Sequence, residues 1–257
     1  MSGLLAFLGS GAYLDTMNEV DHWLLAQTPA RQPRVVCVPT AAVPFGQRKL
    51  DHYSRLALDH FSRLPAQVAI AAIDNRFAAY NPRWIELIRS ADVIYFSGGN
   101  PLYLCQTLAN TPAWQAVCDR WHSGATLAGS SAGAMMLAQP ITLPALNFQL
   151  IPSLGVLPDY CVWPHFDLRP VKRSLTWLKN LLLGRGARAL AIDENTALIG
   201  RLGEKWQVMG AGGVTVISAD RVVRHASGSR WLMTAPDERP QPFVSQPNLV
   251  GVDTGGQ

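Results

Sequence analysis

The sequence lacks the features that mark membrane and nucleic-acid-binding proteins. It contains no run of about 18 apolar residues, the length that a membrane-spanning helix needs. It has 22 Lys and Arg against 18 Asp and Glu, a net charge of +4, but no basic run that would form a nucleic-acid groove. We therefore expect neither partner. Because 48% of the residues are hydrophobic, a disordered or fibrous chain is excluded as well.

Cysteine is scarce too. The 4 cysteines show no CxxC pair and no metal-ligand spacing, and all fall in helix-like or strand-like segments, where single thiols pack as small hydrophobic side chains. The first apolar stretch is short and no basic residue precedes it, so it predicts a buried strand and not a signal peptide. Together these features predict a reduced, cytoplasmic protein.

Short apolar runs alternate with amphipathic segments up to residue 140. The strand-like runs are residues 4–8, 35–38, 68–73, 93–96 and 125–128. The helical patterns between them are residues 15–27, 45–63, 82–90 and 112–122. This alternation predicts an α/β protein with a mostly parallel sheet between two helical layers, a three-layer sandwich with its functional loops at the carboxyl ends of the strands.

The pattern changes after residue 140. We expect a loop over residues 140–158, a short strand at 160–164 and an amphipathic helix at 171–183. Strand-like segments at 189–199 and 205–218 predict a C-terminal β extension or hairpin. No linker divides the chain, so one domain is expected over residues 1–235, followed by a Pro- and Gly-rich tail at 236–257.

The sharpest chemical signal is the G-x-S-x-G segment centred on Ser131. A buried strand ends at Gly129, a helix starts at Ala132, and the neighbouring residues are small, as a nucleophile on a tight strand-to-helix turn requires. The amino end of that helix offers N–H groups to an oxyanion. A serine that only caps the helix is the alternative, and the strand-turn-helix context favours the nucleophile.

A second strand ends in the glycine turn Ser97-Gly98-Gly99-Asn100. Paired glycines there allow a ligand to approach the backbone N–H groups. The same residues also suit an ordinary helix start with Asn100 as the N-cap, and both interpretations can hold together.

One histidine and two neighbouring acids complete the set. His165 lies at the end of a predicted strand, beside a proline and between aromatic residues. Asp193 and Glu194 occupy a bend between two apolar strand halves, where a carboxylate needs a partner. An imidazole is a suitable partner, because the acid holds its tautomer and stabilises the imidazolium.

Four segments in this order resemble the peptidase S51 family, which includes aspartyl dipeptidase (peptidase E) and cyanophycinase. They are Ser-Gly-Gly-Asn at 97–100, Gly-Ser-Ser-Ala-Gly-Ala at 129–134, Pro-His-Phe at 164–166 and Asp-Glu-Asn-Thr-Ala at 193–197. The resemblance implies a class I glutamine-amidotransferase-like (flavodoxin-like) fold, a serine nucleophile, and no metal or organic cofactor. It implies these roles: Ser131 as nucleophile, His165 as general base and acid, Glu194 (or, less favoured, Asp193) as its orienting acid, and the N–H groups of Gly99 and Ala132 as the oxyanion hole.

The resemblance has one departure, since an Asp that the family places shortly after the nucleophile has no counterpart in residues 142–148. Glu194 is therefore the favoured acid. A preference for acidic substrates requires a cation, and several basic residues follow His165, although a solvated basic helix face explains them equally well. The residues expected to bind substrate are Asn100, Asp167, Arg169 and Arg173.

The expected function is a serine-type peptidase or amidase, a monomer or homodimer, that cleaves a small peptide or isopeptide bond, with an adjacent Asp as one candidate. Two alternatives stay open. One is an α/β-hydrolase, whose triad order of serine, acid and histidine would require His225. The other is a non-catalytic binding protein on the same fold. A dinucleotide site is not expected, because the glycine pattern that begins at Gly9 lacks its third glycine.

Overall fold

The computed structural model describes residues 2–142, 150–168, 188–218 and 221–233. The helix expected at 171–183, Arg169, Arg173 and the tail at 236–257 lie outside these described residues. Among the described helices, none combines the length and the apolar character needed to span a membrane.

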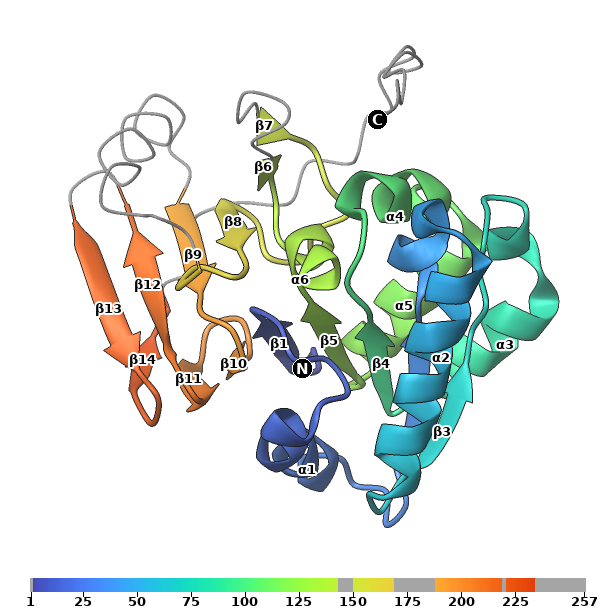
Figure 1. The fold of residues 1–257 in the computed structure, drawn as a ribbon, viewed down its shortest axis with the longest axis horizontal. Coiled ribbons are helices and arrows are strands. Elements are labelled where there is room, and N and C mark those ends of the chain that lie inside the picture. The colour runs from blue at the N-terminus through green and yellow to red at the C-terminus, as the bar shows by residue number, and fades with distance from the viewer. Residues whose placement is uncertain (1, 143–149, 169–187, 219–220, 234–257) are drawn as a thin grey trace.

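A large mixed sheet forms the centre of the molecule (Figure 1). Its eight strands follow the order β14-β11-β10-β1-β5-β4-β2-β3. The five strands β1, β5, β4, β2 and β3 pair in parallel with one another. On the other side of β1, strands β10, β11 and β14 are joined by antiparallel pairs. The strands are β1 (Leu5–Leu8), β2 (Arg34–Val38), β3 (Gln67–Ile70), β4 (Val93–Phe96), β5 (Thr126–Ser130), β10 (Thr196–Gly200), β11 (Lys205–Gly210) and β14 (Arg230–Leu232).

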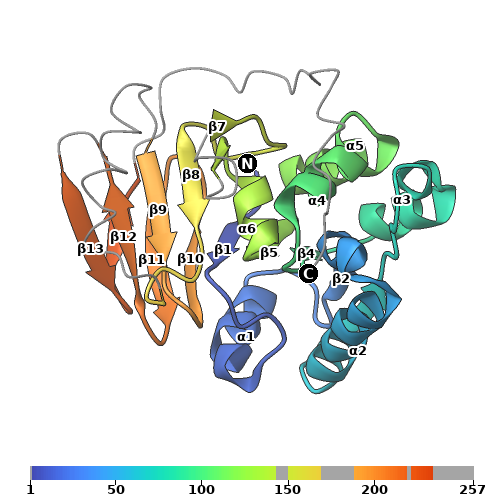
Figure 2. The same cartoon turned by 45° about the horizontal axis from the view of Figure 1, so that its top comes forward.

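Helices cover both faces of this sheet, which confirms the predicted α/β arrangement (Figure 2). In β1, Ala6 and Leu8 pack on the face covered by α1 (Asn18–Ala26) and α2 (Gln47–Ser62). Leu5 and Phe7 pack on the opposite face. Both sets are fully buried, because a parallel strand between two helical layers exposes neither side. The second face is covered by α3 (Pro82–Arg89), α4 (Pro101–Leu108), α5 (Pro112–His122) and α6 (Ala132–Leu137).

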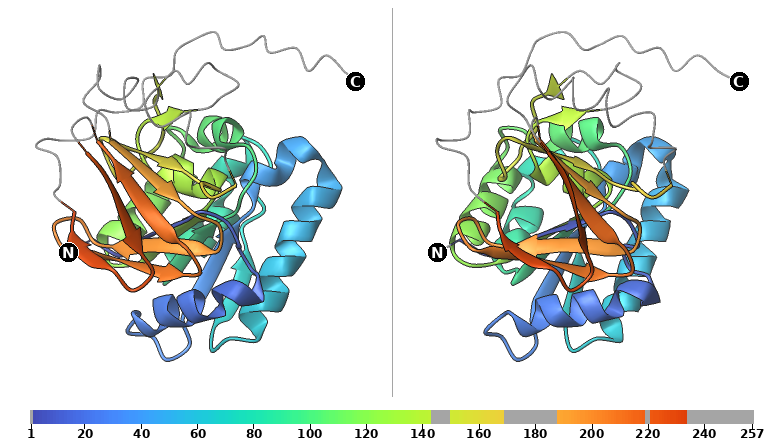
Figure 3. Two further views of the ribbon diagram at one scale, coloured as in Figure 1. Left: turned by 60° about the vertical axis from the view of Figure 1, so that its left-hand side comes forward. Right: turned by 90° about the vertical axis from the view of Figure 1, so that its left-hand side faces the viewer.

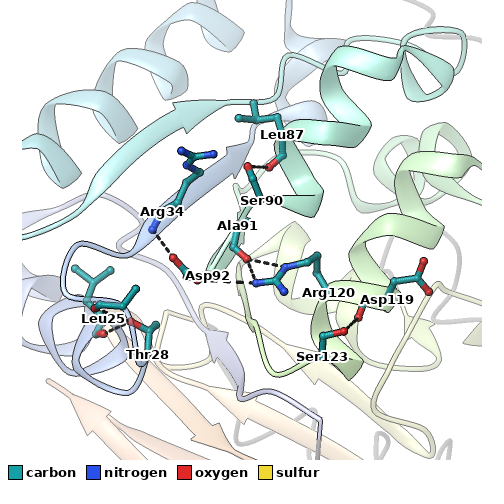
Figure 4. Close-up of polar contacts among 11 residues, drawn as sticks. Leu25, Thr28, Arg34, Leu87, Ser90, Ala91, Asp92, Asp119, Arg120 and Ser123 are labelled. Atoms are coloured by element: carbon teal, nitrogen blue, oxygen red, sulfur yellow. Dashed lines mark hydrogen bonds and ion pairs between the residues drawn. The ribbon is translucent and has the colours of Figure 1, made fainter.

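Polar contacts join the elements at the amino ends of the parallel strands (Figure 4). The Asp92 carboxylate accepts a hydrogen bond of 2.8 Å from the Arg34 N–H. Arg120 of α5 donates to the Ala91 carbonyl at 2.9 Å and lies 3.9 Å from Asp92. The candidate active site lies at the other edge of the sheet, where the same strands end.

A second sheet lies beside the first, with the order β13-β12-β9-β8 (Figure 3). Its inner side chains belong to the same buried cluster as α6. The strands are β8 (Tyr160–Trp163), β9 (Arg188–Ile192), β12 (Gly213–Ile217) and β13 (Val222–Ala226). The segment expected as a loop at 140–158 also carries two short paired strands, β6 (Ile141–Thr142) and β7 (Leu150–Ile151).

The strand-like segments at 189–199 and 205–218 are each divided between the two sheets. The chain leaves β9 in the second sheet, turns at residues 193–195 and enters β10 in the first. It returns from β11 to β12 at residues 211–212 in the same way. Asn195 and Gly210, with φ of +51° and +102°, allow these turns, because the left-handed region reverses the chain sharply. The apolar pattern alone did not reveal this division.

Candidate active site

Ser131 lies on a strained turn between β5 and α6. Its φ of +51° and ψ of −108° place it in an unusual conformation for a non-glycine residue. A Cβ at Gly129 would lie 2.5 Å from the Gly133 carbonyl carbon, and one at Gly133 would lie 2.5 Å from the Phe96 carbonyl oxygen. The small residues that the sequence places here are therefore required by the packing of α6 against β4 and β5.

His165 contacts Ser131 on one side and Glu194 on the other. The Ser131 Oγ lies 2.9 Å from His165 Nε2, and His165 Nδ1 lies 2.8 Å from Glu194 Oε1. In the tautomer with a proton on Nδ1, the imidazole donates to Glu194 and accepts from Ser131. His165 has a φ of +55° and follows β8, so a second strained residue contributes to the same row of hydrogen bonds.

The turn that carries Glu194 is held by its neighbours. The Glu194 N–H donates to Asp167 Oδ1 at 2.9 Å, and the Thr196 hydroxyl donates to the Glu194 carbonyl at 2.9 Å. Asp193 is 2% exposed and contacts other partners than the imidazole. Its carboxylate accepts from the Gly213 N–H at 2.8 Å and pairs with Arg224 at 2.5 Å. Of the two candidate acids, the structure brings Glu194 to His165.

The Gly98-Gly99 turn abuts Ser131. A Cβ at Gly98 would lie 3.4 Å from the Ser131 Cβ. Gly99 has a φ of +142°, and a Cβ there would lie 2.1 Å from the Ala41 carbonyl oxygen. Within the described residues, the N–H groups of Gly99 and Ala132 donate no backbone hydrogen bond. Neither N–H group is therefore engaged by another backbone group of the described residues, as the expected oxyanion role requires.

A cavity of about 230 Å³ opens above Ser131 and His165. Three further segments line it: the loop after β1, the Gly98-Gly99 turn and one face of α2. No Asp or Glu is among the lining residues, which are Ser10, Gly11, Ala12, Leu14, Lys49, His52, Tyr53, Leu56, Gly98, Gly99, Ser130, Ser131 and His165.

The α2 wall was not anticipated from the sequence. Its members Lys49, His52, Tyr53 and Leu56 recur at helical spacing, so one face of the helix presents them together. The Lys49 ammonium lies 5.1 Å from the centroid of the Tyr53 ring, a cation–π distance. None of the ion pairs within the described residues involves Lys49. Burial raises the pKa of Tyr53, so its hydroxyl is protonated at neutral pH.

The structure does not bring all the expected substrate-binding residues to this cavity. The Asn100 side chain caps α4, accepting hydrogen bonds of 3.0 Å from the N–H groups of Leu102 and Tyr103, as in the alternative interpretation. Asp167 contacts the Glu194 backbone and does not line the cavity. Helix capping and turn stabilisation thus account for these two side chains.

His225 is also away from the serine. It lies in β13 of the second sheet, where its ring stacks on Trp231 at a centroid distance of 3.7 Å. The imidazole next to Ser131 belongs to His165. The α/β-hydrolase arrangement with His225 is therefore wrong, because chain order alone does not say which sheet carries a histidine.

The cysteines take no part in this cavity. Burial raises the pKa of the Cys37, Cys105 and Cys161 thiols to about 12, so these groups are protonated at neutral pH and poor nucleophiles. Within the described residues, no three His, Cys, Asp or Glu side chains cluster so that they could hold a metal ion.

This site combines a serine hydroxyl, an imidazole and a carboxylate in one hydrogen-bonded row, beside two backbone N–H groups. The arrangement is typical of hydrolases that use a serine nucleophile. The family model for peptidase family S51 matches residues 5–207. The chain belongs to this family of peptidases.

Relatives and solved structures agree with this assignment. A cyanophycinase of Geminocystis herdmanii is 28% identical over 71% of this chain and 68% of its own length. The uncharacterized peptidase YgaJ of Bacillus subtilis is 26% identical over 77% of this chain and 83% of its own. The crystal structure of a peptidase from an acI-B1 Actinobacterium superposes with a TM-score of 0.81 at 32% identity, covering 91% of this chain and 98% of the other.

Proposed function

We propose that the protein is a serine peptidase that cleaves short peptides or isopeptides through an acyl-enzyme on Ser131. The observation that carries this proposal is the row of hydrogen bonds from Ser131 Oγ to His165 Nε2 and from His165 Nδ1 to Glu194 Oε1, 2.9 and 2.8 Å long. Nucleophile, base and orienting acid must act as a unit in this chemistry, and all three groups are present in contact.

Each group has a defined step in the proposed reaction. The Ser131 oxygen attacks the scissile carbonyl while His165 Nε2 takes its proton, and Glu194 stabilises the imidazolium that forms. The N–H groups of Gly99 and Ala132 donate to the oxyanion. The intermediate collapses as His165 gives the proton to the leaving amine, and a water molecule, deprotonated by the same imidazole, then hydrolyses the ester.

The cavity favours a short substrate with an acidic group. A volume of about 230 Å³ suits a substrate on the scale of a dipeptide and excludes a folded protein chain. Lys49 supplies a positive charge and has no ion-pair partner within the described residues, and none of the described acidic side chains lines the cavity. A carboxylate placed next to the scissile bond, as in an Asp residue, is therefore the proposed specificity element.

The topology supports a place among class I glutamine-amidotransferase-like folds. The neighbours β3-β2-β4-β5 follow the 2-1-3-4 part of the flavodoxin-like strand order, and β1, the first strand of the chain, takes the fifth position. The serine turn then lies at the carboxyl end of β5, next to the end of β4.

The experiment is amine release from a panel of N-terminal Asp dipeptides, β-aspartyl dipeptides and neutral dipeptides. Wild type is compared with Ser131→Ala and with Ser123→Ala, which changes an exposed serine whose hydroxyl donates to the Asp119 carbonyl of the preceding helix. Cleavage by wild type and Ser123→Ala alone would support the proposal and name the substrate. Equal activity of Ser131→Ala would overturn it. A protein that cleaves nothing and leaves Ser131 unlabelled by a fluorophosphonate would be a binding protein.

A further inference from the structure

Tyr13 is a buried tyrosine with a strained backbone whose hydroxyl contacts the strand leading into the Gly98-Gly99 turn. It is 2% exposed, and its φ of +66° is rare for a bulky residue. Its Oη lies 2.9 Å from the Oγ of Ser97, which is fully buried and directly precedes Gly98. Backbone strain of this kind persists only where the surrounding structure imposes it, and it clusters at functional sites.

The bond between the two hydroxyls is isolated from solvent. Burial raises the pKa of Tyr13 well above its ordinary value, so the phenol keeps its proton and the pair remains neutral. Removing the Tyr13 hydroxyl deprives the buried Ser97 hydroxyl of this partner, which costs more than the loss of an exposed hydrogen bond. The Tyr13 hydroxyl also interacts with the buried Cys37 thiol, a contact that Ser97→Ala leaves in place. The bond therefore joins the loop after β1 firmly to the end of β4.

The same loop also contacts the turn that carries Glu194. The Ser10 Oγ accepts a hydrogen bond of 3.0 Å from the Asn195 N–H, and the Thr16 hydroxyl donates to Asn195 Oδ1 at 3.0 Å. The loop lies so close to Asn195 at Gly11 that a Cβ added to this glycine would be 2.6 Å from Asn195 Oδ1. Residues 9–16 thus extend from the acid turn to the Gly98-Gly99 turn and line the cavity between them.

We propose that Tyr13 is a positioning residue: its bond to Ser97 holds the Gly98-Gly99 turn at the place from which Gly99 donates to the oxyanion beside Ser131. This inference rests on the proposed serine peptidase chemistry. Tyr13 itself does not line the cavity. It acts through Ser97, whose backbone continues directly into the Gly98-Gly99 turn.

This role has a kinetic signature. The oxyanion exists only in the transition states and the tetrahedral intermediates, so a displaced donor lowers kcat and leaves substrate binding almost unchanged. Displacements of about 1 Å around a reacting centre cost up to about a hundredfold in rate. A purely structural role for Tyr13 would lower the thermal stability without separating kcat from KM.

The test compares kcat and KM of wild type, Tyr13→Phe, Ser97→Ala and the double variant. Tyr95→Phe is the matched control: its ring lies 5.1 Å from that of Tyr13, and its buried hydroxyl has no hydrogen-bond partner within the described part of the chain. We expect kcat to fall about ten- to a hundredfold in Tyr13→Phe with KM within about twofold. The double variant should resemble the single ones, because both remove the same bond, and Tyr95→Phe should retain the wild-type kcat.

The rate at which a fluorophosphonate labels Ser131 provides a second readout that needs no peptide substrate. If the wild type is labelled but cleaves no peptide, the proposed peptidase function fails, and slower labelling of Tyr13→Phe than of Tyr95→Phe would still support the positioning role. Equal rates in these two variants, or additive effects of Tyr13→Phe and Ser97→Ala, would overturn it. A wild type that is not labelled at all would overturn both.

Discussion

Glu194 and His165 are joined across two strand ends, with Glu194 Oε1 2.8 Å from His165 Nδ1. The preceding acid, Asp193, points the other way and binds Arg224. Adjacent residues in a turn project in different directions, so two neighbouring carboxylates serve different partners. This division gives the first prediction.

Glu194→Gln is expected to lower kcat by a factor on the order of 10³ to 10⁴, because an amide favours the wrong imidazole tautomer and does not stabilise the imidazolium. Asp193→Asn retains an acceptor for the Gly213 N–H and should cost less than about tenfold, since its partner Arg224 is 55% exposed. Steady-state kinetics on the peptide identified above measures both variants. A larger loss in Asp193→Asn would show that the acid has been misassigned.

Gly99→Ala is expected to lower kcat by about a hundredfold, the effect of losing one oxyanion donor. The added Cβ would clash with the Ala41 carbonyl oxygen at 2.1 Å, so the turn has to move. Gly203→Ala is the control, because Gly203 also has a positive φ, +79°, but has no atom within 4 Å of the new Cβ. That variant should lose about 1–2 kcal/mol of stability from the backbone alone and retain its kcat. Equal kcat values in the two variants would contradict the oxyanion role of Gly99.

Lys49→Met is expected to raise KM about tenfold for acidic dipeptides and to leave neutral dipeptides unchanged, since it removes a charged hydrogen-bond donor. Arg48→Met removes the same charge from the neighbouring exposed residue, which does not line the cavity. Ratios of kcat/KM for acidic and neutral substrates separate the two variants. The same change of ratio in both would mean that the net charge of the helix, and not Lys49, attracts the substrate.

Asp21→Ala is expected to lower the free energy of unfolding by about 3–5 kcal/mol. Asp21 and His60 are both 1% exposed, and their side chains lie 2.8 Å apart, so the change leaves a buried imidazole without its partner. Asp15→Ala provides the comparison, because Asp15 pairs with Arg63 at 3.1 Å on the surface, with 74% of its side chain exposed. Asp15→Ala should lower the free energy of unfolding by less than about 1 kcal/mol. Urea unfolding of both variants measures the difference, and similar losses would contradict it.

The pH dependence of stability follows from the same buried acid. Burial raises the pKa of Asp21 above its ordinary value of 3.8, against the opposing effect of His60. The Asp21 carboxyl therefore binds its proton more tightly in the folded protein than in the unfolded chain. The stability that this proton contributes is complete below pH 3.8 and is lost as the pH rises through the raised pKa of the folded state. As the pH rises from 3.8 through the raised pKa, the free energy of unfolding of wild type should fall relative to that of Asp21→Asn, which cannot titrate at this position. A rise would contradict the direction of the shift.

Local patterns predicted the elements that depend on local chemistry. Strand β4 and helix α5 have the expected bounds, because a buried parallel strand is apolar throughout and Thr111 with Pro112 marks a helix start. The Ser131 turn was predictable for the same reason: small residues between a strand and a helix are needed whatever the rest of the chain does.

Other features depend on segments far apart in the sequence. The loop at Ser10 meets Asn195 because β1 pairs with β10, and the α2 wall faces the cavity because the helix packs across the sheet. The bend at Asp193 and Glu194 was expected, but the placing of the two strand halves in different sheets was not, since strand pairing and not hydropathy decides it.

The sequence by itself determined the alternating strands and helices, the strand-turn-helix at Ser131 and the presence of a histidine and two acids with suitable chemistry. Only the tertiary structure decided that Glu194 and not Asp193 meets His165, that Lys49 and Tyr53 line the cavity, and that Tyr13 binds Ser97. The physical reason is that backbone propensity and burial act over a few neighbouring residues, whereas these contacts arise from strand pairing and helix packing between residues distant along the chain.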